Sequence, residues 1–155
     1  MTATHDQIVT ALQGVLATAF ADLDPEPEFR VRDPRLIDVA KDAGTDLRAL
    51  VMLIPGAVSQ VGFLNGDPPI WDLSAAFDLG IDAVGPDDAV REARVSAIRT
   101  AASAAITANY RLGGVASYAE VRRWTPETGQ DEGMPAETMH ELQIEVLFQS
   151  LTPTG

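Results

Sequence analysis

The sequence predicts an α+β fold: a mixed, mostly antiparallel sheet of four to five strands, with an N-terminal helix and one long helix packed on one side. Three observations predict it. Apolar residues recur at helical spacing in residues 6–20, alternate with polar ones in residues 71–83, and accompany many alanines in residues 87–109. A chain of 155 residues without an internal repeat has the size of one domain, so we expect a single domain over residues 1–155.

The first helix is predicted for residues 6–20. Thr4 and Gln7 precede its apolar stripe in the form of a capping box, in which each side chain bonds the other residue's backbone N–H. Residues 22–30 contain two prolines and are expected to be a connector. Residues 33–44 begin with Asp-Pro and end with Gly, which predicts a short helix.

Strands are predicted around one clear hairpin turn. The apolar run at residues 49–54 ends at Pro-Gly and is typical of a central strand buried on both faces. Residues 57–64 should be extended, and residues 65–69 should form a turn. In residues 71–83 the odd positions are apolar and most even positions are polar, which predicts one core face and one wet, acidic face.

The C-terminal half should contain one long helix and two strands. Gly85-Pro-Asp-Asp is typical of a helix start, and the helix should end near Asn109. Residues 115–124 predict a strand with Ala116, Tyr118 and Trp124 on one side. Residues 125–137 should form a long exposed loop, and residues 140–151 alternate as the last strand.

Composition excludes several functional classes. The chain has 23 Asp and Glu against 11 Lys and Arg, a net charge of -12, so its field repels nucleic acid and anionic lipid. It has no cysteine and two histidines, which leaves little for thiol or zinc chemistry. No long apolar run or basic leader is present, so we expect the chain to stay in the cytosol and to bind no membrane.

The sequence predicts no catalytic residue, cofactor or metal, and hence no enzyme. No Gly-x-Ser-x-Gly elbow accompanies His5 or His140, and the Gly-rich steps match neither a phosphate loop nor a dinucleotide fingerprint. Five acids could meet on one sheet face: Asp72, Asp78, Asp82, Glu141 and Glu145. No accompanying His or Lys suggests a paired-carboxylate or metal site, so we interpret these acids as a solvated face or as the lining of a lumen.

Four large side chains are candidates for a subunit interface: Phe63, Trp71, Trp124 and Met134. Aromatic residues are favoured in interface hot spots, although a Trp at a strand end is also common at the edge of a core. The segments around residues 56–69 and 125–137 could supply the two different patches that a closed ring requires.

The whole pattern resembles the tail-terminator proteins of long-tailed bacteriophages and gene transfer agents, a minor tail protein family. The resemblance rests on the helix at 8–20, the strands at 49–54, 71–81 and 142–148, and the helix at 87–109, which together span most of the chain. The predicted helix at 33–44 departs from that pattern.

The resemblance implies a structural subunit that forms a hexameric ring at the head-proximal end of a tail tube, stops tube growth and offers a surface for head attachment. It implies three protein partners: further copies of the chain, the tail tube protein and a head-tail connector or neck protein. DNA would only pass through the ring. The protein would assemble in the bacterial host cytoplasm and reside in the tail of a virion or phage-like particle.

Two other classes remain open from the sequence. The chain could be another tail or head-tail completion protein, since these share small α/β folds without diagnostic residues. It could also be a small-molecule enzyme or a binding module. An enzyme requires a deep pocket with convergent polar groups, and a binding module requires an apolar concavity on the sheet.

Overall fold

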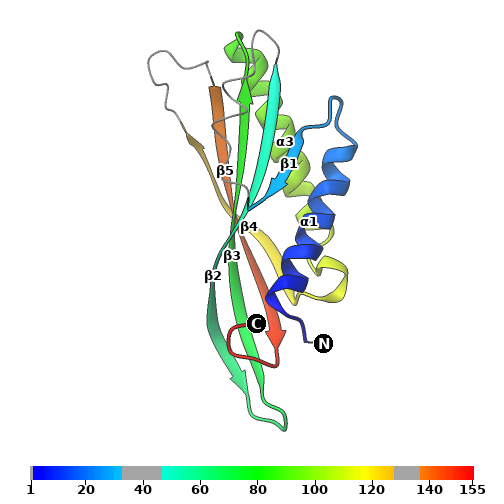
Figure 1. Cartoon of the computed structure of the whole chain (residues 1–155), viewed down its shortest axis with the longest axis vertical. Helices are drawn as coiled ribbons and strands as arrows, with labels where there is room; N and C mark the ends of the chain where they lie inside the picture. The colour runs from blue at the N-terminus through cyan, green and yellow to red at the C-terminus, as the bar shows by residue number, and fades with distance from the viewer. Residues whose placement is uncertain (1, 33–46, 128–136) are drawn as a thin grey trace.

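A computed structural model describes residues 2–32, 47–127 and 137–155 of the chain (Figure 1). In chain order the elements are α1 (His5–Ala21), β1 (Glu28–Val31), β2 (Arg48–Leu64), β3 (Ile70–Val84), α3 (Asp88–Ala108), the 3₁₀ turn η1 (Leu112–Gly114), β4 (Tyr118–Glu127) and β5 (Glu137–Ser150). The predicted α+β fold is confirmed.

The five strands form one sheet in the order β1-β2-β3-β5-β4. The short β1 runs parallel to β2, and the other three pairs are antiparallel, so the sheet is mixed and mostly antiparallel as predicted. Both helices lie on the same side of this sheet (Figure 1). The opposite face of its central strands carries no helix within the described ranges.

The core lies between the two helices and the helix-facing side of the sheet. β3 contributes its odd positions to this core and β5 its even positions, because neighbouring strands place paired residues on the same face. The alternation predicted for both strands is therefore confirmed. The largest fully buried side chains include Phe20, Phe77 and Phe148.

The predicted capping box begins α1. Gln7 N donates to Thr4 Oγ1 at 3.2 Å, and Thr4 N donates to Gln7 Oε1 at 2.9 Å, so two backbone donors at the helix start are satisfied. The helix α3 begins after Asp87, whose Oδ1 accepts from Val90 N at 3.1 Å. Pro86 therefore precedes the cap rather than occupying the first turn.

Two predictions in the first half of the chain were wrong. Pro55-Gly56 does not end a strand, because β2 continues through it with a bulge between Pro55 and Val58. The predicted connector contains β1, which is only four residues long and too short to show a period. Phe29 of β1 packs on Phe20 of α1, with 5.2 Å between ring centroids, so a long-range contact holds the strand in place.

The strand β4 also differs from its prediction. It begins at Tyr118 and continues to Glu127, which shortens the predicted loop at its N-terminal end. A bulge between Val121 and Arg123 reverses the alternation, so Tyr118 and Trp124 lie on opposite faces of the sheet rather than on one side. The predicted helix at 33–44 and the central part of the predicted loop at 125–137 lie outside the described residues.

Candidate functional site

The open face of the sheet gathers the predicted acidic residues. The register of β3 and β5 places Asp72, Asp78, Asp82, Glu141 and Glu145 on the side opposite the helices. Glu137 of β5 joins them there, and neither strand contributes a Lys or Arg to this face. We call these six residues the acidic face.

Hydrogen bonds and ion pairs organise part of the acidic face. Gln149 Nε2 donates to Asp72 Oδ1 at 2.9 Å across the two central strands. Arg122, at the bulge of β4, lies 3.7 Å from Glu145 Oε2 and also pairs with Glu120 at 2.6 Å. The negative charge of the face is therefore partly balanced from the β4 edge.

Asp82 differs from the other acids because it is buried. Its exposed fraction is 5%, so the expectation of a wet position was wrong for this residue. Burial, together with the charge of Glu137 and a side-chain hydrogen bond to it, raises the pKa of Asp82 to about 7. One carboxylate oxygen, Oδ1, has no hydrogen-bond partner. Asp82 therefore exchanges a proton near neutral pH.

No metal-binding cluster is found in the described ranges. Across residues 2–32, 47–127 and 137–155, no group of three or more His, Cys, Asp or Glu side chains lies in a position to hold an ion. The acids of the open face are distributed along two strands rather than gathered at one point. This arrangement fits an extended charged surface.

The hairpin of β2 and β3 exposes apolar side chains on its outer part. We call residues 54–71 the hairpin arm, because β1 pairs with β2 only as far as Leu53. Val61, Phe63 and Leu64 of the arm are all exposed, and Phe63 packs on Trp71 with 4.5 Å between ring centroids. Two of the four predicted interface residues thus meet at one place.

Trp124 lies at the other edge of the sheet. It is 47% exposed, and the Arg99 guanidinium of α3 sits 4.0 Å from the centroid of its ring. Its other neighbour is His140, with 5.2 Å between ring centroids. Trp124 on β4 is therefore separated from Phe63 on β2 and Trp71 on β3 by the strand β5. The fourth candidate, Met134, lies outside the described residues.

The β4 edge carries further exposed aromatic and arginine side chains. Ala119 N donates to Tyr110 O at 2.7 Å, which holds the end of α3 against the start of β4, and the Tyr110 and Tyr118 rings lie 5.6 Å apart. We define the aromatic–arginine surface as Tyr110, Arg111, Tyr118, Arg122, Arg123 and Trp124, all of which are exposed. Sequence reasoning had named one of the six, because their proximity depends on the packing of α3 against β4.

A buried polar network connects α3 to β5. Arg99 Nη1 donates to His140 Nδ1 at 2.9 Å, so the ring proton resides on Nε2, which donates to Glu92 Oε1 at 3.2 Å. Burial lowers the pKa of His140; the charge of Glu92 opposes this and that of Arg99 adds to it. His140 is therefore a neutral structural residue that joins a helix to a strand.

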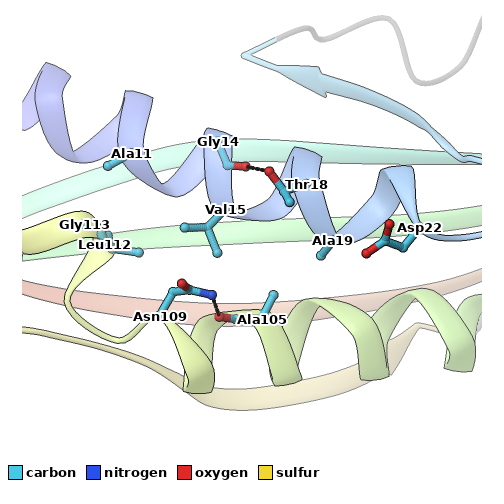
Figure 2. A pocket seen from close by; sticks show the side chains of 10 residues that line it. All are labelled: Ala11, Gly14, Val15, Thr18, Ala19, Asp22, Ala105, Asn109, Leu112 and Gly113. Atoms are coloured by element: carbon cyan, nitrogen blue, oxygen red, sulfur yellow. Dashed lines mark hydrogen bonds between the residues drawn. The ribbon is translucent and has the colours of Figure 1, made fainter.

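A shallow groove of about 670 Å³ lies between α1 and the end of α3. Figure 2 shows the side chains that line it. Small side chains line most of it, among them Ala11, Gly14 and Ala105. Its polar groups face their own helices: Thr18 Oγ1 donates to Gly14 O at 2.9 Å, and Asn109 Nδ2 donates to Ala105 O at 2.8 Å. The groove thus offers space without a set of converging polar groups.

No protein-family model matches the chain, and no curated protein is significantly similar to it. None of the helices within the described segments is long and apolar enough to cross a membrane.

Proposed function

We propose that this chain is a structural subunit of a phage-type tail: the tail terminator, which closes into a ring at the head-proximal end of the tail tube, stops tube growth and offers the head-attachment surface. The acidic face carries the proposal. Five half-buried carboxyl groups and the buried Asp82 lie on one side of the two central strands, which contribute no basic residue there, and the described helices lie on the other side.

Such a face suits the wall of a channel through which DNA passes. Negative side chains repel phosphates, so DNA would cross the ring without binding to its wall. In a ring whose sheets face inward, the helices form the outer layer, and the acidic face meets the DNA.

The two side edges of the sheet support a ring as well. A closed ring needs a heterologous contact between two different patches on each subunit. The hairpin arm lies at the β2 edge and Trp124 at the β4 edge, so exposed apolar groups occur on two different sides of the molecule.

The test combines mass and shape. Light scattering of the purified protein should give the mass of about six copies, and negative-stain electron microscopy should show rings that cap one end of tail tubes built from the tube protein of the same genome. A protein that leaves both tube ends bare at every concentration would contradict the proposal.

Variants that neutralise the acidic face distinguish an effect on DNA transfer from an effect on ring formation. In the triple variant Asp72→Asn, Asp78→Asn and Glu145→Gln, we expect rings to form and cap tubes as before while DNA transfer through the particle slows, because phosphates then bind the wall. Loss of the ring in this variant would show that these acids build the subunit contact instead.

A further inference from the structure

The aromatic–arginine surface has the composition of a protein-binding hot spot. Trp, Tyr and Arg are the residue types that contribute most to binding energy at interfaces, and here three aromatic rings and three arginines follow the β4 edge, with Tyr118 and Trp124 on its two faces. Arg111 lies 6.0 Å from the Tyr110 ring, and Arg122 and Arg123 directly precede Trp124. No other exposed set in the described parts of the chain combines these residue types in this way.

Its charge sets it apart from the rest of the molecule. The net charge of the chain is -12, whereas this surface carries three arginines, of which Arg122 is paired with Glu120 and Glu145. A partner that is apolar and neutral or slightly acidic would therefore meet attraction here and repulsion at the acidic face.

The hairpin arm of a second copy has these properties. It exposes Val61, Phe63 and Leu64, and Asp67 is its one charged residue. It lies at the β2 edge, on the opposite side of the sheet from β4, so each copy carries both halves of the contact. An exposed apolar hairpin without charged side chains along its strand is a site that proteins normally cover.

The directions of β2 and β4 are also compatible with a contact between the two edges of neighbouring copies. β2 and β4 run in opposite directions within the chain, because three antiparallel pairings separate them. Copies placed side by side therefore bring β2 of one antiparallel to β4 of the next. Both edges contain bulges, at Pro55–Val58, Gln60–Gly62 and Val121–Arg123, which interrupt a continuous ladder, so side chains must supply most of the contact.

We propose that the aromatic–arginine surface of one copy receives the hairpin arm of a second copy of this chain. The contact is heterologous, so it continues from copy to copy until a ring closes. The inference rests in part on the proposed function, since it names the contact that would join the subunits of the terminator ring.

The test uses one substitution on each half and a matched control. Val61→Lys places a cation on the arm opposite the arginines, and Arg123→Glu reverses a charge on the receiving surface. Val90→Lys makes the same change at an exposed valine of α3, away from both edges. In sedimentation velocity over a concentration series, we expect Val61→Lys and Arg123→Glu to weaken self-association at least about tenfold, while Val90→Lys matches the unmodified chain.

Mixing the two edge variants decides the geometry. Each variant keeps one intact half, so an equimolar mixture of Val61→Lys and Arg123→Glu should associate although each alone is monomeric. A mixture that stays monomeric, an unmodified chain that never associates, or oligomers that ignore both substitutions would overturn the inference.

Three further outcomes each have one meaning. Binding of a short DNA duplex in fluorescence anisotropy, abolished by Arg123→Glu, would assign the surface to nucleic acid and overturn the inference. Copies that join through these two surfaces but cap no tail tube would overturn the proposed function alone. Rings that cap tubes and are unaffected by both variants would overturn this inference alone.

Discussion

The two halves of β2 share one strand but lie in different environments. Residues 50–53 lie between β1 and β3 and are buried, with Val51 and Leu53 in the hydrophobic core. Beyond Leu53, β1 has ended, and Ile54, Val61, Phe63 and Leu64 are exposed although they are equally apolar. The difference teaches that position in the fold, rather than composition, decides which part of an apolar strand becomes core and which part stays exposed.

The largest expected effect separates the two halves directly. Leu53→Ala removes a fully buried side chain and should lower the free energy of unfolding by about 2–5 kcal/mol. Val61→Ala, at a position 61% exposed, should change it by less than about 0.5 kcal/mol. Urea denaturation of the dissociated protein measures both. Equal losses of unfolding free energy would show that the part of β2 around Val61 belongs to the folding core of the isolated chain.

The next effect is the pH dependence of stability. It arises at Asp82 of β3, which pairs in register with Leu50 in the buried part of β2. Burial raises the pKa of Asp82 to about 7 from 3.8, so the folded protein keeps a proton that the unfolded chain loses between these values. The contribution of this group to stability is therefore present below about pH 4 and lost as the pH rises through about 7.

Asp82→Asn cannot ionise and should be more stable than the unmodified protein above pH 7, by roughly 2 kcal/mol, with the gain vanishing near pH 4. Thermal or urea unfolding between pH 4 and 8.5 measures it. Asp72→Asn, on the same strand opposite Gly62, is the matched control for the change of an acid to an amide. A gain independent of pH would assign the effect to packing instead.

The smallest effect is expected at Gly56, where the buried part of β2 meets its exposed part. A Cβ at Gly56 would lie 3.1 Å from the backbone oxygen of Ala76, which cannot move without shifting β3, so Gly56→Ala should cost about 1 kcal/mol. Gly14→Ala is the control: nothing lies within 4 Å of that position in α1, so the change should stabilise the protein by about 0.5–1 kcal/mol. Guanidinium denaturation measures the free energy of unfolding of both variants, which should change in opposite directions.

Much of the fold could be predicted because its signals are local. The capping box at Thr4, the period of two in β3 and β5, and the length of α3 depend on residues adjacent in sequence, and each is confirmed. The five acidic residues were also assigned to one side of the sheet, since a strict alternation fixes the face of each residue whatever strand lies next to it.

The candidate interface residues were less predictable. Phe63 and Trp71 meet because the hairpin register pairs them, which the turn at residues 65–69 made foreseeable. The gathering of Tyr110 and Arg111 with Tyr118 and Trp124 was not, because it requires α3 to end beside the start of β4.

The sequence by itself determined where α1, α3, β3 and β5 form and that β3 and β5 carry an acidic side, because capping and periodicity are properties of neighbouring residues. Tertiary structure alone decided that β1 covers only Leu50–Leu53, that Asp82 is buried, and that a bulge turns Trp124 to the helix side of the sheet. These features depend on contacts between distant segments and on one extra residue in a ladder, and neither leaves a periodic pattern in the chain.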